Sequence, residues 1–452
     1  MNKVLILGAG LVAKPMVEYL LLNRFRLMIA SPVKNRADEM IGSNPFGSST
    51  DWSMADTQTL EKLVSEYDIT VSLLPFKFHA DVARVCLRYK KSLITTSYEQ
   101  AAVLSLNEPA KKAGVIFLNE MGLDPGIDHM SAMRIINTIH AKGGKVSELY
   151  SLCGALPAPE SATNPLKYKF TWSPTGVILA SLNSARYLKK GKEVLISPDN
   201  LFKARFRFTF PGIDDLEVYP NRDSMNYIDI YGIPEVETIY RGTIRFQGWC
   251  ETLDAMKTLK MLDDTYKDNK SNTYAEFLGA RTRSNIKDLK GSITGHLGIS
   301  DKSVVIEALD WLGFFREEEL RKKSATPFDI TSDKMITQML LSDNERDMVL
   351  MQHMALASYP DGKKEVVRSY MTDYGTPSAN TAIARTVSLP AAITVKMILE
   401  NKLKLKGVLR PVVPEIYNPV LDELKNMGIE MKEEYGLPER EIISFHSIPE
   451  GI

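Results

Sequence analysis

Short apolar runs alternate with amphipathic stretches over the first 128 residues of the chain. The apolar runs lie at Val4–Leu7, Arg26–Ala30, Ile69–Leu74, Ser92–Thr96 and Val115–Leu118. The stretches with helical periodicity lie between them, at residues 11–23, 34–41, 56–66, 78–90 and 99–113. Strands that are apolar on both faces need cover on both sides, which is typical of a parallel sheet with helices on each face. This part is therefore predicted to form a doubly wound α/β domain. Residues 43–52, rich in Gly, Ser, Asn and Pro, leave room only for a short edge strand near their end.

The pattern changes near residue 147. Segments with strand character then follow irregular links rich in Pro and Asn, at Glu148–Cys153, Ala204–Phe210 and Glu237–Gln247. These segments predict a second sheet that is mixed or antiparallel. From about residue 251 to residue 355, amphipathic helical stretches dominate.

The last part of the chain returns to the first patterns. Lys364–Asp373 is predicted to be one more strand, and Thr381–Asn401 a long apolar helix with Pro390 inside or beside it. We expect this helix to pack on the first domain. The chain is thus predicted to combine a parallel α/β domain, an α/β (α+β) substrate-binding domain with a mixed sheet, and an all-helical insertion. The expected limits are 1–128 with the helix at about 376–402 for the first domain, 129–255 with about 356–375 and 403–452 for the second, and 256–355 for the insertion.

Composition excludes several classes of function. The 452 residues include 56 basic and 56 acidic ones, so net charge gives no reason to expect nucleic acid or an anionic membrane as partner. No apolar run reaches the roughly 18 residues of a membrane span, and we expect no signal peptide, because the first apolar run is predicted to be a strand. The three cysteines and six histidines show no spacing of a disulfide framework or metal site. We therefore expect no metal and a cytoplasmic location.

The first apolar run leads into a glycine turn, VLILGAGLVA. Gly8 allows a sharp turn, Gly10 lets a pyrophosphate approach the backbone, and Ala13 lets a helix pack close to the sheet. A helix starting at about Leu11 would offer its N–H groups to the phosphates. The glycine turn lies after a predicted strand and before an amphipathic helix. This position favours a Rossmann-type dinucleotide site over an ordinary tight turn.

The choice between NAD and NADP stays open on these residues. An acidic side chain at the end of the second strand usually binds the ribose of NAD, but here the strand ends in Ser31. Lys34 and Arg36 follow and are able to hold a 2′-phosphate, or equally to lie in solvent at the start of a helix. Ser31 itself suits a 2′-hydroxyl.

Polar residues follow several predicted strands. Asp124, in the segment NEMGLDPGIDHM, is expected to cap the helix that begins at Pro125 and also to assist proton transfer at the sheet edge. His129, on the same segment, is expected more as a packing residue than as a substrate contact. Tyr98 ends another strand at that edge. Cys153, beside a glycine at a strand end, is a candidate proton donor, or a small buried side chain.

Two arginine segments complete the candidate chemistry. Arg222 lies in YPNRDS, and the segment RGTIR runs from Arg241 to Arg245. A guanidinium group binds a carboxylate through two parallel hydrogen bonds, so two such groups facing the nucleotide sheet across one crevice would suit a substrate with several carboxylates. Surface ion pairs are the alternative for each.

The chain resembles the glutamate-forming saccharopine dehydrogenases, also called saccharopine reductases. The resemblance covers essentially the whole chain. It is carried by the glycine turn and by Ser72-Leu73-Leu74-Pro75 with His79, Thr96-Ser97-Tyr98, Gly122 to Met130, Cys153-Gly154 with Leu156-Pro157-Ala158-Pro159, Asn164-Pro165 with Tyr168-Lys169-Phe170, Trp172-Ser173-Pro174, Tyr219 to Ser224, and Arg241-Gly242-Thr243 with Arg245.

This resemblance implies an oxidoreductase of lysine metabolism that interconverts saccharopine with glutamate and 2-aminoadipate 6-semialdehyde, using NAD or NADP. It implies cofactor contacts from Gly10, Leu11, Val12, Ala13, Leu74, Thr96, Ser97, Leu123, Asp124, Pro125 and Ser173. It implies saccharopine contacts from Ser97, Tyr98, Asp124, Arg222, Thr243, Ile244 and Arg245. Asp124, Cys153 and Tyr98 are then the candidates for acid–base steps, in an order that the sequence leaves open.

Two residues depart from the family pattern. Ala155 stands where many members have a second glycine, and Ser31 stands where the fungal, NADP-using enzymes tend to have an arginine. Serine there is more similar to the NAD-using domain of the bifunctional lysine-degrading enzymes, so the cofactor stays NAD or NADP. The chain lacks their upstream reductase domain, which predicts a stand-alone dehydrogenase.

Two other functions remain as alternatives. One is a reductase of another carboxylated imine, such as a carboxyspermidine-type substrate. The other is a dinucleotide-binding regulator without catalysis, which the combination of Asp124, Tyr98, Cys153 and both arginine segments disfavours. The apolar faces of the helical block are compatible with a homodimer interface or with a core of their own.

Overall fold

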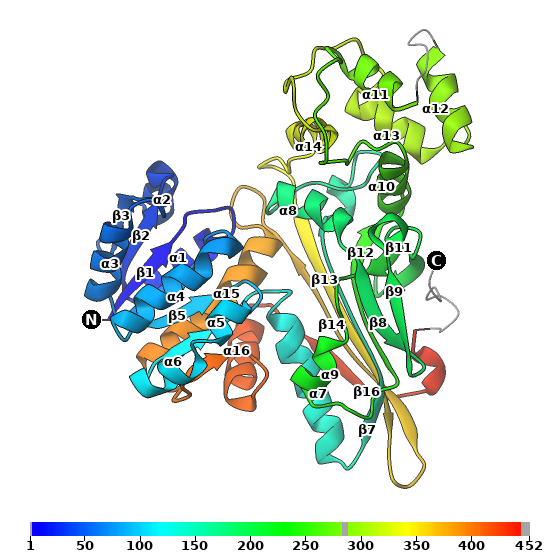
Figure 1. Cartoon of the computed structure of the whole chain (residues 1–452). Coiled ribbons are helices and arrows are strands. Elements are labelled where there is room, and N and C mark those ends of the chain that lie inside the picture. Colours follow the sequence, from blue (N-terminus) through cyan, green and yellow to red (C-terminus); the bar gives the residue numbers. More distant parts are fainter. Residues whose placement is uncertain (1, 283–287, 444–452) are drawn as a thin grey trace. The chain divides into compact units, whose positions relative to one another are not determined.

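The computed structural model describes residues 2–282 and 288–443 (Figure 1). Its contacts divide the chain into two compact units. The first unit comprises Met1–Val146 and Met351–Leu437, and the second comprises Ser147–Leu350 and Pro438–Ile452. The expected three-part domain division, with its separate helical insertion, stays a prediction.

A seven-stranded parallel sheet forms the centre of the first unit. Its strands are, in spatial order, β15 (Gly407–Leu409), β6 (Ile116–Leu118), β5 (Ser92–Thr95), β4 (Ile69–Ser72), β1 (Lys3–Leu7), β2 (Arg26–Ser31) and β3 (Gly47–Asp51). Every neighbouring pair is parallel. Strand order reverses beside β1, and the loops after the strands therefore open on one edge where ligands bind in such folds. The short strand expected at the end of residues 43–52 is β3.

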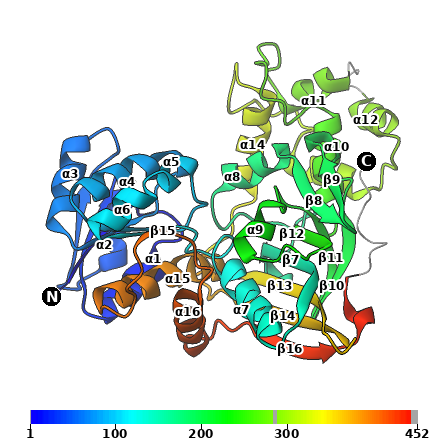
Figure 2. The same ribbon diagram turned by 60° about the horizontal axis from the view of Figure 1, so that its bottom comes forward.

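Helices cover both faces of this sheet. They are α1 (Lys14–Leu22), α2 (Lys34–Ile41), α3 (Thr57–Glu66), α4 (His79–Arg88), α5 (Ala101–Leu104), α6 (Asn107–Ala113) and α15 (Ala382–Leu399). Contacts group α1 with α2 and α15, and α4 with α3, α5 and α6. Figure 2 shows α3, α4 and α6 on one side of the sheet and α15 on the other. The doubly wound parallel fold predicted from the apolar runs is confirmed.

The long apolar helix α15 returns to the first domain, as expected, and includes Pro390 within its length. By length and composition it is able to cross a membrane, but 72% of its 18-residue window is buried inside the structure. It packs against α1, as a core helix does. The first unit also contains α7 (Ile127–Ala141), most of β13 (Asp347–Ser358), β14 (Lys364–Tyr374), α16 (Pro414–Asn426) and β16 (Lys432–Leu437).

The second unit contains mixed β-structure. Its strands are β7 (Lys145–Pro157), β8 (Ala185–Lys189), β9 (Lys192–Ile196), β10 (Phe206–Phe210), β11 (Ile213–Pro220) and β12 (Thr238–Phe246). β12 runs parallel to β7 but antiparallel to β11 and β8. The mixed sheet predicted for the second domain is thus confirmed.

Helices make up much of the rest of the second unit. They are α8 (Pro174–Leu179), α9 (Asn226–Tyr231), α10 (Trp249–Thr258), α11 (Tyr274–Thr282), α12 (Leu289–Leu297), α13 (Val304–Leu312) and α14 (Pro327–Gln338). Figure 1 shows α11 to α14 gathered in one block. Single turns of 3₁₀-helix occur at Phe76–Phe78, Pro159–Ser161, Ala180–Leu182, Pro198–Asn200 and Glu439–Glu441.

Three expectations about these elements are wrong. The first helix begins at Lys14, not near Leu11, because Pro15 has no N–H and fits only the first turn of a helix. The strand β13 (Asp347–Ser358) begins inside the expected helical block, since a strand that is buried on both faces shows no alternating pattern. β15 pairs with β6 in the parallel sheet, although 403–452 was expected in the substrate-binding domain.

The turn that leads into α7 is built on a close approach of two backbone segments. Gly126, the residue before the helix, has φ of +149°, and its N–H donates to Oδ1 of Asp128 over 2.6 Å. A Cβ at this position would lie 2.0 Å from the carbonyl oxygen of Gly122. The expected cap by Asp124 and helix start at Pro125 are wrong, because α7 begins at Ile127 and the residue before it is Gly126.

We predict that Gly126→Ala destabilises the protein by more than about 3 kcal/mol, because backbone strain and a steric clash add. Gly143→Ala is the matched control. Gly143 also has a positive φ, +76°, but a Cβ there would meet nothing within 4 Å. The substitution should therefore lower the free energy of unfolding by only about 1 kcal/mol. Equal shifts of the urea midpoint for the two variants would contradict this account of the turn.

Candidate active site

The turn between β1 and α1 has the geometry that a dinucleotide phosphate requires. Gly8 has φ of +108°, and its N–H donates to the carbonyl of Ala30 over 2.9 Å. No heavy atom lies within 4 Å of the position that a Cβ of Gly10 would take, so the backbone there is open to a ligand. Ala13 is fully buried directly before α1, whose peptide dipoles favour an anion at this end. These residues fit the dinucleotide expected from the sequence.

The end of β2 carries no carboxylate. Ser31 is 1% exposed, and its hydroxyl accepts a hydrogen bond from the N–H of Val33 over 3.2 Å. The Lys34 ammonium pairs with Asp38 over 2.6 Å, so its charge is compensated within α2. Arg36 is exposed to solvent. This arrangement accommodates either NAD or NADP.

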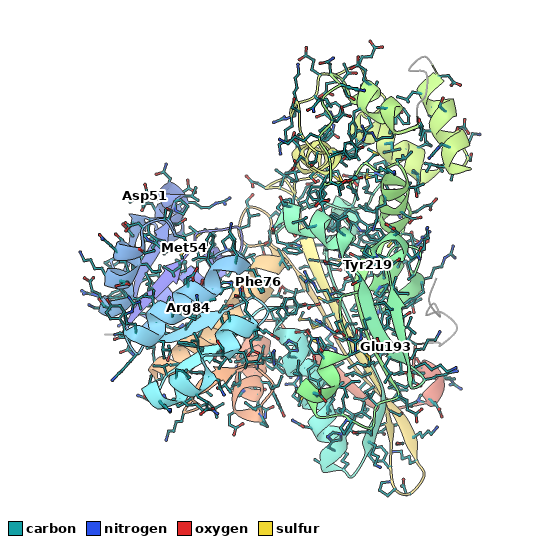
Figure 3. The ribbon with its side chains drawn as sticks, in the orientation of Figure 1. Asp51, Met54, Phe76, Arg84, Glu193 and Tyr219 are labelled. Carbon is teal, nitrogen blue, oxygen red and sulfur yellow. The ribbon has the colours of Figure 1, made fainter. Side chains whose placement is uncertain are left out.

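Apolar side chains surround the same edge of the sheet. Leu11, Val33 and Phe76 follow the neighbouring strands β1, β2 and β4 and are 48%, 52% and 53% exposed. Phe76 is labelled in Figure 3. Leu74 is partly buried against the core, and Leu123 is buried. Exposed apolar groups at a glycine turn suit the flat rings of a cofactor.

Tyr98 and Asp124 form a side-chain pair at this edge. The Tyr98 hydroxyl donates to Oδ1 of Asp124 over 2.9 Å, and both side chains are half-buried. The N–H of Ser97 donates to Oγ1 of Thr95 over 3.0 Å, which fixes the backbone just before the tyrosine. A Cβ at Gly122 would lie 3.2 Å from the carbonyl of Thr96, so the two loops pack closely. The structure therefore brings together two of the three predicted acid–base residues.

A buried ionic network lies behind this pair. Glu120 receives a 2.7 Å contact from Nε2 of His129 and a 3.0 Å contact from Nε of Arg410. Arg410 also pairs with Glu99 over 2.7 Å, and the N–H of Glu99 donates to Oε1 of Glu120 over 2.8 Å. Glu120 itself has φ of +61°. The network thus joins the residue after Tyr98 to the loop that carries Asp124.

The pKa of Glu120 shows the strength of these contacts. Burial by itself would raise the pKa of this carboxyl, but the hydrogen bond and charge of His129, the Glu99 N–H and the Arg410 charge outweigh burial and lower the pKa to about 2. His129 is fully buried in this network and contacts Glu120 through Nε2, so whether it also touches the substrate stays a prediction.

Cys153 lies beside Thr243 in the second unit, in register across the parallel pair of β7 and β12. The thiol is buried. A Cβ at Gly154 would lie 2.7 Å from the carbonyl of Ile244, so a glycine allows the two strands to approach here. The Ile244 side chain is fully buried in the core, and only its backbone is available to a ligand.

Arg245 is held in an aromatic cage. Its side chain is 5% exposed, with the guanidinium 4.9 Å from the ring centre of Tyr168 and 5.7 Å from that of Trp249. One nitrogen donates to the Ile244 carbonyl over 2.8 Å. In the part of the chain that the structure describes, Nε has no hydrogen-bond partner and no carboxylate lies within 4.0 Å of the guanidinium.

The groups around Arg245 do not neutralise its charge. Burial raises the pKa of Tyr168, and it raises that of Tyr219 (labelled in Figure 3) to about 12, so both phenols stay protonated at neutral pH. A buried guanidinium without a counter-charge costs several kcal/mol. Arg245 therefore favours the binding of an anionic group.

The other two arginines are placed by their own contacts. Arg241 is buried, donates to the Tyr227 hydroxyl over 2.8 Å and stacks on that ring at 4.3 Å. Arg222 is exposed, with φ of +52°, and its carbonyl accepts from the N–H of Arg186 over 2.9 Å. Ser224, two residues after Arg222, connects the two arginine segments, because its hydroxyl accepts a hydrogen bond from the Arg241 N–H over 3.0 Å. The two segments are thus linked within the second unit.

Ser173 has a structural partner. Its hydroxyl accepts from the N–H of Gly176 over 3.3 Å and caps α8, and the side chain is exposed. Its expected contact with the cofactor stays a prediction. The same holds for the expected crevice between the arginines and the nucleotide sheet.

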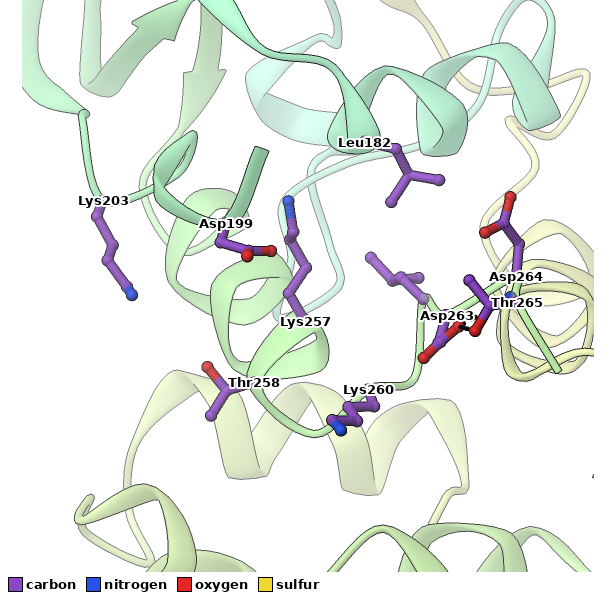
Figure 4. Close-up of a pocket in the computed structure, with 10 residues that line it drawn as sticks. Leu182, Asp199, Lys203, Lys257, Thr258, Lys260, Asp263, Asp264 and Thr265 are labelled. Atoms are coloured by element: carbon purple, nitrogen blue, oxygen red, sulfur yellow. Dashed lines mark hydrogen bonds between the residues drawn. The ribbon is translucent and has the colours of Figure 1, made fainter. Parts of the chain in front are cut away.

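A cavity of about 440 Å³ in the second unit contains none of the predicted site residues (Figure 4). It is lined by Leu182, Asp199, Lys203, Lys257, Thr258, Lys260, Leu262, Asp263, Asp264 and Thr265. Charges of both signs line it, and the Lys257 ammonium already donates to the carbonyl of Ser181 over 2.8 Å. Within residues 2–282 and 288–443, no group of His, Cys, Asp and Glu side chains could hold a metal ion.

Sequence reasoning missed several contributors to the site. The network residues Glu99 and Arg410 carry no sequence signal, because they are charged residues far apart in the chain. Tyr168 entered the sequence analysis only as part of the family resemblance. Asn164 fixes its backbone by accepting from its N–H and donating to its carbonyl, over 3.3 and 2.8 Å.

Comparisons with known proteins match the chain over nearly its whole length. Residues 4–118 match the family model of the saccharopine dehydrogenase NADP binding domain, and residues 122–429 that of the saccharopine dehydrogenase C-terminal domain. The saccharopine dehydrogenase [NADP(+), L-glutamate-forming] of Saccharomyces cerevisiae is 37% identical over 444 residues, which cover 96% of this chain and 99% of that one.

Two further matches concern a longer relative and a solved structure. The mitochondrial alpha-aminoadipic semialdehyde synthase of Bos taurus is 34% identical over 446 residues, covering 95% of this chain but 47% of that one. The apo structure of histidine-tagged saccharopine dehydrogenase (L-Glu forming) from Saccharomyces cerevisiae superposes with a TM-score of 0.88, at 35% identity, and covers 96% of this chain and 100% of that one.

The ionic network predicts a loss of stability in acid. Because the pKa of Glu120 is lowered from 4.5 to about 2 in the folded state, its carboxylate stabilises the protein above pH 4.5, and this contribution disappears as the pH falls toward 2. It is worth on the order of 3 kcal/mol at neutral pH. Glu120→Gln should therefore lower the free energy of unfolding at pH 7 by about this amount, and by less at pH 4.

Urea denaturation at the two pH values tests this, with Glu61→Gln as control, since Glu61 forms a surface ion pair with Arg88. A difference between wild type and Glu120→Gln that does not shrink in acid would contradict the assignment.

Proposed function

The chain belongs to the saccharopine dehydrogenase family, and we propose that it oxidises saccharopine to L-glutamate and 2-aminoadipate 6-semialdehyde. It is an oxidoreductase of lysine metabolism and uses NAD or NADP. Matches to both family models support saccharopine over a carboxyspermidine-type substrate. The observation that carries the proposal is the buried, uncompensated guanidinium of Arg245, because saccharopine brings three carboxylates and one secondary amine.

Most of the residues that would hold the cofactor lie in the first unit. Gly8, Gly10 and Ala13 would hold the pyrophosphate at the start of α1, with Leu11 and Val12 in the same turn. Ser31 would bind the adenosine ribose, and the remaining contacts would come from Leu74, Thr96, Ser97, Leu123, Asp124 and Pro125, and from Ser173 of the second unit. When bound, the cofactor accepts a hydride from the carbon next to the substrate nitrogen.

The protein residues bind the substrate and move protons. Arg222 and Arg245 bind carboxylates. Thr243 and the backbone of Ile244 directly precede Arg245 on β12, where Thr243 pairs with Tyr219 near the end of β11. The secondary amine has to lose its proton before oxidation, and water then attacks the resulting imine. Such steps gain about 10²- to 10⁴-fold from a positioned acid or base.

Asp124 is the base for the amine proton. The hydrogen bond from Tyr98 holds its carboxylate in one orientation, which supports this role over a capping role. Ser97 and Tyr98 bind the substrate beside it. Cys153 supplies a thiol as the proton donor of the hydrolytic step.

The proposal extends to the location and the partners of the protein. The three cysteines are buried thiols that form no disulfide, which suits a reducing cytoplasm. The substrates are small molecules, and neither nucleic acid nor a membrane is a partner. A homodimer stays a prediction.

Substitution of Arg245 tests the function. We expect Arg245→Met to raise KM for saccharopine at least tenfold, because it removes a buried carboxylate ligand worth about 1.5–3 kcal/mol. KM for the cofactor should not change. The free energy of unfolding of the free protein should not fall, since the substitution removes a buried charge.

Arg207→Met is the control, because Arg207 is exposed on β10 of the same sheet. A stability loss in Arg245→Met with unchanged KM would assign the guanidinium a structural role and contradict its role in substrate binding.

Substitution of Ser31 tests the cofactor site. Ser31→Asp should lower the ratio of kcat/KM for NADPH to that for NADH by about tenfold or more, because a carboxylate there repels a 2′-phosphate. Ser31→Asn is the matched neutral control, since both side chains are able to accept from the Val33 N–H. The same change of ratio in both variants would show that Ser31 does not face the ribose.

A further inference from the structure

A buried histidine joins two strand ends at the site. His79, the first residue of α4, is 2% exposed. Its Nδ1 lies 3.0 Å from the hydroxyl of Ser72 at the end of β4, and its Nε2 lies 2.9 Å from the hydroxyl of Ser97 after β5. Both ring nitrogens are therefore used, one at each strand.

The ring is neutral at physiological pH. Burial lowers the pKa of His79 to about 4. A neutral imidazole has one N–H and one lone pair, so it donates to one serine and accepts from the other.

The position of Ser72 selects between these two arrangements. Its side chain is fully buried, and in the described part of the chain the His79 ring is the partner of its hydroxyl. If Nδ1 donated to Ser72, the serine proton would be buried without an acceptor, at a cost of about 1–3 kcal/mol. The arrangement of lower energy has Ser72 donating to Nδ1 and the Nε2–H donating to Ser97.

The consequence concerns the direction of the Ser97 hydroxyl. Its oxygen accepts from the ring, so its own proton points away from His79. The Ser97 backbone is already fixed by its N–H bond to Thr95, and the side chain is half-buried. The Ser97 hydroxyl proton is then still able to rotate about the C–O bond, and the hydrogen bond from His79 restricts this rotation.

We propose that His79 is a positioning residue, which fixes the Ser97 hydroxyl as a hydrogen-bond donor to an acceptor oxygen of the bound ligand. This rests on the proposed function, in which Ser97 contacts both cofactor and substrate. The acceptor is a substrate carboxylate or the nicotinamide carboxamide. The two are distinguished by whether KM for saccharopine or KM for the cofactor responds.

A double-mutant cycle tests the proposal. His79→Leu should raise KM for one ligand about three- to tenfold, the value of one hydrogen bond. In the background of Ser97→Ala, the same substitution should have no further effect, because His79 acts through Ser97. His79→Gln keeps an N–H donor and should recover part of the loss. His296→Gln, at an exposed site on α12, is the control.

Two results would overturn the proposal. One is an equal effect of His79→Leu on KM with and without the Ser97 hydroxyl, which would make His79 a purely structural residue. The other comes from nitrogen NMR of the wild-type protein, where the His79 proton is expected on Nε2 and its presence on Nδ1 would contradict the relay. The NMR result does not depend on turnover, so it separates a failure of this proposal from a failure to oxidise saccharopine.

Discussion

The ion pairs of Arg410 hold together two loops of the first unit that carry the proposed acid–base residues. This residue lies far along the chain, just after β15, yet it contacts both Glu99 and Glu120. These two residues flank the loops that carry Tyr98 and Asp124. Removing one partner of a buried ion pair strongly destabilises a folded protein. The network therefore favours one fixed arrangement of both loops. The hydrogen bond from Tyr98 to Asp124 depends on that arrangement.

The second unit contains a buried charge that its neighbours do not neutralise, unlike the buried charge of Glu120 in the first. In the first unit, the buried carboxylate of Glu120 is matched by His129 and Arg410. In the second, the described neighbours of Arg245 are aromatic rings and a backbone carbonyl. An enzyme gains from leaving a charge uncompensated where the ligand brings the counter-charge. The contrast supports the proposal that Arg245 binds a carboxylate of the substrate, whereas Glu120 stabilises the fold.

Much of the fold was accessible from local patterns. The apolar runs predicted the parallel sheet because both faces of its strands are buried, and the glycine turn predicted where the first loop opens. The same logic failed for β13, whose residues are buried on both faces and lie in a helical context. It failed for β15 because three residues are too few to carry a period.

For the candidate site, the sequence predicted the chemistry-bearing residues but not the residues that support them. Strand ends and turns drew attention to Asp124, Tyr98 and Arg245, since chemistry-bearing residues gather where parallel strands end. The residues that support them were not predictable. Glu120 and Arg410 are paired only by the folded topology, and the role of His79 depends on two hydroxyl groups that the chain brings together from different strands.

The most direct measurement counts products. The purified chain should convert saccharopine, with NAD or NADP, into reduced cofactor, glutamate and 2-aminoadipate 6-semialdehyde in equal amounts. A protein that binds the cofactor but reduces none of it with saccharopine, or that reduces it without releasing glutamate, would contradict the central claim.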